Sequence, residues 1–71
     1  MARTTLNVKG MTCNHCVAAV TEALEKTPGV RSARVDLQQG KAVVDHDDAL
    51  ASSRDLAAVV TDAGYQADAE G

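Results

Sequence analysis

Aromatic residues are almost absent from this chain of 71 residues. It has no tryptophan, no phenylalanine and no isoleucine, and Tyr65 is its one aromatic side chain. A buried core must therefore be built from valine, leucine and alanine. A chain this short has room for one small domain, residues 1–71, and too little for an extended enzyme cleft. These features favour a compact binding module over an enzyme.

Positive charge is also in short supply. The chain has seven Lys and Arg against ten Asp and Glu, which gives a formal net charge of −3. A nucleic-acid partner is not expected, because neutralising phosphates takes clustered Lys and Arg. No apolar run approaches the roughly 18–20 residues of a membrane span, and the N-terminal segment lacks the apolar stretch of a secretory signal. We expect a cytoplasmic protein that is not itself a membrane protein.

The apolar pattern predicts a helix between strands. Val17, Val20 and Leu24 have helical spacing, so a helix is expected from about Cys16 to a stop at Pro28. Four strands are predicted where apolar and polar residues alternate, the last of them weak and at a sheet edge, in residues 3–8, 30–37, 41–46 and 65–69.

A second helix is expected to begin near Ser53. Ser52 and Asp55 have the spacing of a capping box, in which each side chain bonds the backbone N–H of the other residue. Gly64 should end this helix as a left-handed cap. Its buried stripe is expected to contain four residues, namely Leu56, Val59, Val60 and Ala63.

The resulting order of elements is βαββαβ. This order predicts an α+β fold, the ferredoxin-like sandwich, with two helices on one face of a four-stranded antiparallel sheet. The other face of the sheet should be solvated, and four residues are expected to point outward there: Arg34, Asp36, Val43 and Asp45.

Cys13 and Cys16 are the two cysteines of the chain, too few and too close in sequence for a disulfide framework. They lie where a loop is predicted to turn into a helix, and a helix N-terminus favours the thiolate, which is the metal-binding form. Hard cations such as Mg²⁺ and Ca²⁺ prefer oxygen ligands, and structural Zn²⁺ usually takes four ligands. Two thiolates therefore point to a soft ion, and Cu(I) fits best.

A lone C-x-x-C motif leaves two other interpretations open. One is a thioredoxin-like redox centre, and the other is a pair of incidental thiols. The redox interpretation lacks a tryptophan beside the pair, and the single proline, Pro28, ends a helix.

Residues 10–16 read Gly-Met-Thr-Cys-Asn-His-Cys and resemble the G-M-T-C-x-x-C loop of heavy-metal-associated domains. The predicted βαββαβ order extends this resemblance over essentially the whole chain. The resemblance implies that Cys13 and Cys16 are the ligands of Cu(I). Relatives that favour zinc, cadmium or lead often carry an acidic residue before the first cysteine, whereas this chain has Thr12 there.

The resemblance also implies roles for residues around the cysteines. Met11 is expected to pack under the loop rather than bind metal. His15 would tune the basicity of the thiolates or join a copper-bridged dimer, with a solvated loop side chain as the alternative. Tyr65 would lie near the metal loop, with simple core packing as the alternative. His46 ends a strand and is expected to be structural rather than a ligand.

In function, the resemblance implies a bacterial-type copper chaperone rather than an enzyme. Such a protein carries Cu(I) and delivers it by exchange of thiolate ligands to a copper-transporting P-type ATPase, with a copper-sensing repressor as a second candidate partner. A monomer is expected without metal, with a copper-bridged homodimer as an option. The start at Met1 and the end at Gly71 favour a stand-alone protein. The alternatives are the same domain from a longer ATPase, a periplasmic mercury-binding relative and a small dithiol oxidoreductase.

Overall fold

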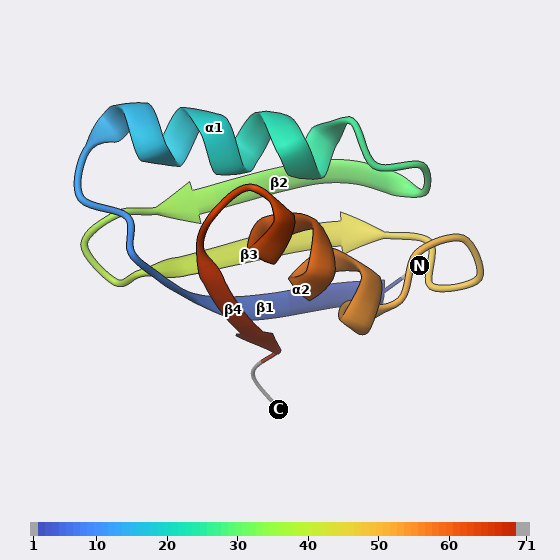
Figure 1. The fold of residues 1–71 in the computed structure, drawn as a ribbon. Helices are drawn as coiled ribbons and strands as arrows, with labels where there is room; N and C mark the ends of the chain where they lie inside the picture. Colours follow the sequence, from blue (N-terminus) through green and yellow to red (C-terminus); the bar gives the residue numbers. More distant parts are fainter. Residues whose placement is uncertain (1, 70–71) are drawn as a thin grey trace.

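The computed structural model describes residues 2–69 and confirms the expected order of elements. Figure 1 shows the two helices and four strands along the chain. Their bounds are β1 (Ala2–Lys9), α1 (Asn14–Glu25), β2 (Val30–Asp36), β3 (Lys41–His46), α2 (Ser53–Asp62) and β4 (Gln66–Ala69).

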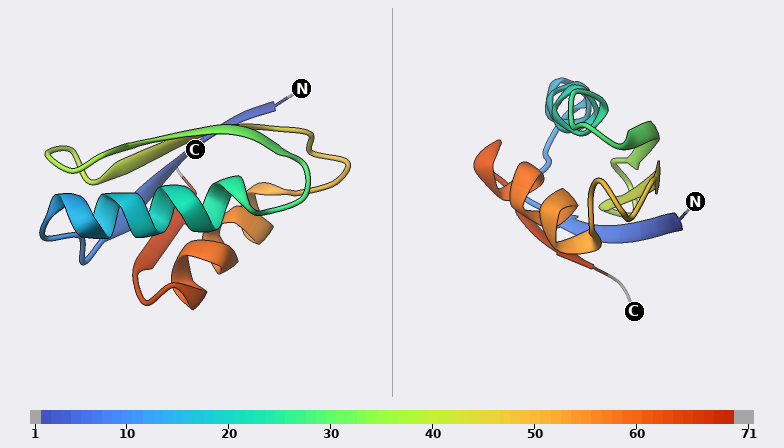
Figure 2. Two further views of the ribbon diagram at one scale, coloured as in Figure 1. Left: turned by 90° about the horizontal axis from the view of Figure 1, so that it is seen from above. Right: turned by 90° about the vertical axis from the view of Figure 1, so that its right-hand side faces the viewer.

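The four strands form one antiparallel sheet in the order β2-β3-β1-β4. Both helices cover the same face, with α1 against β2 and α2 against β4 (Figure 2). The predicted ferredoxin-like sandwich is therefore confirmed, and β4 lies at the sheet edge as expected. No helix within residues 2–69 combines the length and the apolar character needed to cross a membrane.

Within residues 2–69, the buried apolar residues between the sheet and the helices are all valine, leucine or alanine, as the composition predicts. These nine residues come from both helices, β1, β3 and the loop before α2: Leu6, Val8, Val20, Leu24, Ala42, Val44, Ala51, Leu56 and Val60. Two members of the expected α2 stripe differ from the prediction. Val59 is only partly buried. Ala63 is exposed, because α2 ends at Asp62 and Ala63 is its C-cap.

Helix α1 begins two residues earlier than the sequence pattern suggests. Cys13 is the N-cap, in an extended conformation, and its carbonyl oxygen accepts from the N–H of Cys16 at 3.0 Å. The first turn is exposed and polar, so hydrophobic spacing gives no sign of it, although its backbone bonds are already helical. Cys16 consequently lies inside the first turn of α1 and not in the loop before it.

Helix α2 begins as predicted. The Ser52 hydroxyl accepts from the backbone N–H of Asp55, and the Asp55 carboxylate accepts from the N–H of Ser52 at 3.0 Å. This confirms the capping box. The helix stops before Gly64, whose φ of +104° continues the chain in the left-handed region toward Tyr65 and β4.

Candidate metal centre

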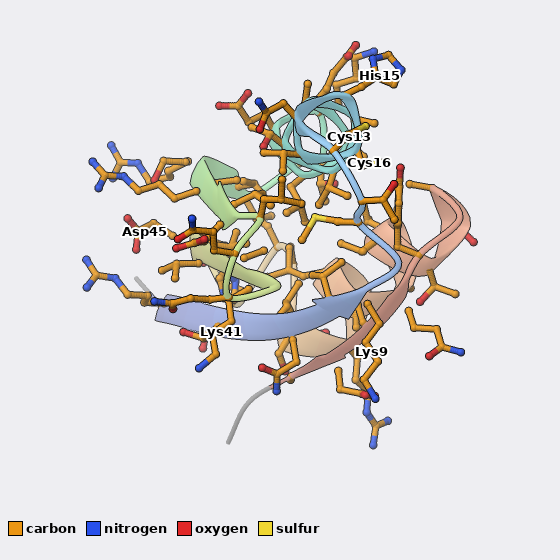
Figure 3. The ribbon with its side chains drawn as sticks, turned by 90° about the vertical axis from the view of Figure 1, so that its left-hand side faces the viewer. Lys9, Cys13, His15, Cys16, Lys41 and Asp45 are labelled. Carbon is orange, nitrogen blue, oxygen red and sulfur yellow. The ribbon has the colours of Figure 1, made fainter. Side chains whose placement is uncertain are left out.

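The two cysteines lie at the end of the molecule where the loop after β1 enters α1. Both are free thiols, with Cys13 exposed and Cys16 partly buried. Their Sγ atoms are 3.8 Å apart, close enough for both sulfurs to contact one ion. Figure 3 shows the pair at the N-terminal end of α1, on the surface of the molecule.

Electrostatics at this helix end favours negative charge on sulfur. The first N–H groups of a helix have no carbonyl partner within it and carry partial positive charge. The first turn of α1 has no acidic residue, and the Cys13 side chain makes no capping hydrogen bond. Negative charge carried by the sulfurs of this loop, or by an anionic complex that they form, therefore balances the positive end of α1.

Cys16 is the more strongly activated sulfur. Hydrogen bonds from the backbone N–H of Thr12 and then from the Tyr65 hydroxyl lower the pKa of Cys16 from 9.0 to about 6, against the opposing effect of desolvation. Smaller contributions come from Cys13 and from the Thr12 hydroxyl, whose oxygen lies 3.9 Å from Cys16 Sγ. At neutral pH the Cys16 thiolate predominates, so a metal ion need not displace a proton from it.

Tyr65 reaches the loop from the opposite end of the chain. A Cβ atom placed on Gly10 would lie 3.5 Å from the Tyr65 ring, so the ring packs over the start of the loop. The hydrogen bond to Cys16 raises the pKa of the Tyr65 hydroxyl. The structure therefore brings together Cys13, Cys16 and Tyr65, and Tyr65 also packs against the core.

Two other singled-out residues, Met11 and His15, have different surroundings. Met11 packs against the core, in line with its expected place under the loop. His15 is exposed and lies on the outer side of α1, away from both sulfurs (Figure 3). Met1, the other soft sulfur group of the chain, lies outside the described residues.

His46 is structural, as expected. Its ring is 1% exposed, and its two nitrogens lie 2.7 Å from the Ala51 carbonyl oxygen and 2.7 Å from the Thr4 hydroxyl. The carbonyl can only accept, so Nδ1 donates to it. Among residues 2–69, no three His, Cys, Asp or Glu side chains converge on a point that would hold a metal ion. Within this range the structure therefore offers the pair Cys13 and Cys16 with no third converging side chain of these types.

The sequence model of the heavy-metal-associated domain family matches residues 5–66. The chain belongs to this family. The copper chaperone CopZ of Enterococcus hirae is 42% identical over 62 residues, which cover 87% of this chain and 90% of that protein. CopZ of Staphylococcus aureus is 40% identical over 65 residues, covering 92% and 96%. The crystal structure of a copper-binding domain from HMA7, a P-type ATPase, superposes with a TM-score of 0.98 at 35% identity, covering 100% and 96%.

One residue of this heavy-metal-associated domain was missed by sequence reasoning. Thr12 was considered only because it is not acidic, yet its backbone N–H is the largest cause of the lowered pKa of Cys16. The type of a residue does not show whether its backbone N–H will donate to a nearby sulfur. The spacing of Gly10 and Cys13 in the motif is the signal that could have suggested this hydrogen bond from Thr12.

Proposed function

We propose that this chain is a copper chaperone that binds one Cu(I) ion between Cys13 Sγ and Cys16 Sγ. The observation that carries the proposal is the pair of free thiols 3.8 Å apart at a helix N-terminus, one with a pKa of about 6. CopZ proteins about 40% identical over most of the chain support copper as the cargo. We take residues 1–71 as one heavy-metal-associated domain.

The oxidation state follows from ligand chemistry. Two thiolates, with no third converging ligand among residues 2–69, suit a soft, closed-shell ion that accepts low coordination numbers, which favours Cu(I) over Zn²⁺ or a hard cation. A bis-thiolate Cu(I) unit carries one net negative charge, and the positive end of α1 stabilises that charge.

The separation of the sulfurs bears on how the ion is bound and released. With metal–sulfur bonds of about 2.3 Å, a linear arrangement would hold the sulfurs about 4.6 Å apart. The observed 3.8 Å is shorter, so the loop either widens or holds the ion at a bent angle. A bent two-coordinate ion is open on one side, where a third thiolate can bind.

We propose that transfer proceeds by exchange of thiolate ligands. A thiolate of the acceptor bonds to copper and gives a three-coordinate intermediate, and the copper–Cys13 bond breaks first because Cys13 is exposed. Cys16 leaves second, since hydrogen bonds from Thr12 and Tyr65 hold its sulfur in place. The second acceptor thiolate replaces it, and copper remains Cu(I) throughout.

The acceptor we propose is a copper-transporting P-type ATPase. HMA7 is a P-type ATPase whose copper-binding domain shares this fold, and this likeness supports a domain of the same kind as the acceptor. The same likeness favours a second candidate function, in which this domain is itself the acceptor within a longer ATPase.

We further propose a cytoplasmic location, no enzymatic reaction, a copper-sensing repressor as a second partner and a copper-bridged homodimer as an additional form.

The test of copper binding is competition with a strong Cu(I) chelator under reducing conditions. The parent chain should remove one equivalent of Cu(I), and the Cys13→Ser, Cys16→Ser double variant should remove none. Thr61→Val, which removes the α2 hydroxyl that donates to the Ala57 carbonyl oxygen, serves as the control and should compete like the parent. A double variant that still competed would contradict the ligand assignment.

The two candidate functions differ in their partners. A stand-alone chaperone should transfer Cu(I) to the metal-binding domain of a P-type ATPase encoded beside its own gene. To test delivery, the loaded chain is mixed with this domain, the two are separated by size exclusion, and the copper in each is measured. A partner that remained free of copper would contradict delivery. Reduction of insulin disulfides by the apo chain would instead support the dithiol oxidoreductase alternative.

A further inference from the structure

The face of the sheet that carries no helix has a different charge from the rest of the molecule. Although the chain carries a net charge of −3, five of its seven Lys and Arg lie on the strands: Arg3, Lys9, Arg31, Arg34 and Lys41. Only three carboxylates accompany them there: Asp36, Asp45 and Asp68. The helices and their connections hold the remaining described acidic residues together with Lys26 and Arg54.

Strand geometry explains why these cations gather on one side. Leu6 and Val8 of β1 are buried under the helices, so Arg3 and Lys9 point to the opposite face. Arg34 lies opposite Val43 in the register of β2 and β3. Figure 3 shows Lys9, Lys41 and Asp45 on the outer side of the sheet, away from the cysteines.

This face is hollowed along β2 and β3. Three adjoining hollows share lining residues, so they form one shallow groove. Asp45 lies near one end and Lys41 near the other, which at about 3.3 Å per strand residue makes the groove about 13 Å long. Val43 contributes an apolar patch to its floor. An extended segment of about four or five residues matches this length.

The charged side chains of the groove are held in place at one end. Arg3 Nε donates to Asp45 Oδ1 at 2.9 Å, and the Ser32 hydroxyl donates to Asp45 Oδ2 at 3.1 Å. This bond uses Nε, and the Arg3 side chain remains 72% exposed. Arg34 lines two of the hollows and makes no ion pair within the described residues. Four cationic residues line the three hollows, namely Arg3, Arg31, Arg34 and Lys41, against two carboxylates, those of Asp36 and Asp45, so positive charge exceeds negative charge in the groove.

We infer that this groove, lined by Arg3, Arg31, Ser32, Arg34, Lys41 and Val43, docks an extended acidic segment of a protein partner. Charge complementarity supports an anionic occupant, and the length and apolar floor favour a polypeptide over a small ion. A single-stranded nucleic acid fits less well, because it needs aromatic side chains for base stacking and Tyr65 lies at the metal loop. The inference concerns the metal-free protein and does not depend on copper.

The probe is a fluorescein-labelled peptide of six glutamates, titrated into the isotope-labelled apo chain at low salt. Fluorescence anisotropy gives the affinity, and amide shifts in the NMR spectrum locate the site. Amides of β2, β3 and the start of β1 should shift, whereas those of α1 and α2 should not. A peptide of six glutamines should produce neither effect.

Charge-reversal variants separate a groove from a general charge effect. Arg34→Glu should weaken binding of the glutamate peptide by about fivefold or more, since it replaces an attraction with a repulsion. Arg54→Glu makes the same change in net charge on exposed α2 and should change the affinity less than twofold. Both residues are exposed, so both variants should fold, which circular dichroism verifies.

Three results would overturn the inference. The first is equal loss of affinity in Arg34→Glu and Arg54→Glu, which would indicate net charge alone. The second is peptide-induced shifts confined to the helices. The third is tighter binding of a thymidine oligonucleotide or of inorganic phosphate than of the glutamate peptide at the same amides, which would make the occupant a phosphate-bearing ligand.

Discussion

Cys13 Sγ and Cys16 Sγ lie 3.8 Å apart, yet the two sulfurs have different surroundings. Cys13 is the exposed N-cap of α1. Cys16 lies in the first turn, where the backbone of Thr12 and the hydroxyl of Tyr65 bond its sulfur. Because of this asymmetry, we expect Cys16 to keep its bond to the metal ion longer. We expect the ion to bind and leave at Cys13, whose sulfur is accessible.

The first prediction concerns the reactivity of Cys16. In the apo protein its alkylation by iodoacetamide should rise steeply around pH 6 and level off above about pH 7, because only the thiolate reacts and its pKa is about 6. Mass spectrometry of each cysteine over time gives the rates. A Cys16 rate that still climbed tenfold per pH unit above pH 7 would contradict the lowered pKa.

The same pKa has a consequence for folding. The Cys16 pKa is lower in the folded chain than its ordinary value of 9.0, so the folded state binds this proton more weakly than the unfolded state. The resulting stabilisation is fully present above about pH 9 and is lost as the pH falls toward 6.

The second prediction isolates the Tyr65 hydroxyl. Tyr65→Phe keeps the ring over Gly10 and removes the hydrogen bond to Cys16, so the alkylation profile of Cys16 should move to higher pH. Release of Cu(I) to a chelator should also become faster, because the sulfur that leaves last is held less firmly. Thr61→Val loses a hydroxyl elsewhere and should leave the profile where it is. If the alkylation profiles of Tyr65→Phe and the parent overlapped, the Tyr65 hydroxyl would have no effect on Cys16.

The third prediction is that metal adds stability to a fold that exists without it. The apo chain should unfold cooperatively with temperature, since its buried apolar core lies between the sheet and helices and not around the cysteines. Free Cu(I) at a hundredfold excess over its dissociation constant should stabilise the fold by about 2.7 kcal/mol. Thermal unfolding followed by circular dichroism measures both. The double cysteine-to-serine variant should show the apo transition and no copper-induced shift.

The fourth prediction concerns the buried imidazole. His46→Leu should lower the free energy of unfolding by about 2–3 kcal/mol, because the Ala51 carbonyl and the Thr4 hydroxyl lose their partner. Thr4→Val should cost only about 1 kcal/mol. Urea denaturation of both single variants and the double variant gives the coupling between the side chains. Strict additivity would show that the two side chains do not interact.

The fifth prediction compares two glycines with similar backbone angles. Gly29 has φ +94° and Gly64 has φ +104°, so alanine at either site is strained, at a cost of about 1 kcal/mol. A Cβ on Gly29 would also lie 2.7 Å from Leu50 Cβ, whereas one on Gly64 meets nothing within 4 Å. Gly29→Ala should therefore be clearly more destabilising than Gly64→Ala in urea. Equal midpoints would mean that Leu50 moves aside freely.

The sequence predicted the fold well because its signals are local. Ser52 and Asp55 form their capping box from backbone and side chains three residues apart, and no distant residue is needed. Alternation in β3 likewise gave its bounds at Lys41 and His46. The predicted start of α1 was too late. Its first turn, which begins at Asn14, is polar and exposed and therefore lacks the helical spacing of apolar residues on which the prediction depended.

The candidate site was predicted only in part. Cys13 and Cys16 could be proposed as ligands from the sequence because their identities and spacing suggest the chemistry by themselves, and the structure places their sulfurs 3.8 Å apart. The lowered pKa of Cys16 was not predicted, because it comes chiefly from a backbone N–H of Thr12. The groove on the helix-free face was also not predicted, since it depends on the register that sets Arg3 beside Asp45 and Arg34 beside Val43.

By itself, the sequence determined the order of elements, the aliphatic composition of the core and the identity of the two thiols. Each of these depends on residue type and on spacing of a few positions. Tertiary structure alone decided that Tyr65 bonds Cys16 and that strands carrying five of the seven Lys and Arg lie side by side in one sheet. These depend on which strands pair and where the chain turns at Gly64, because residues far apart in sequence interact only after the sheet has set their positions.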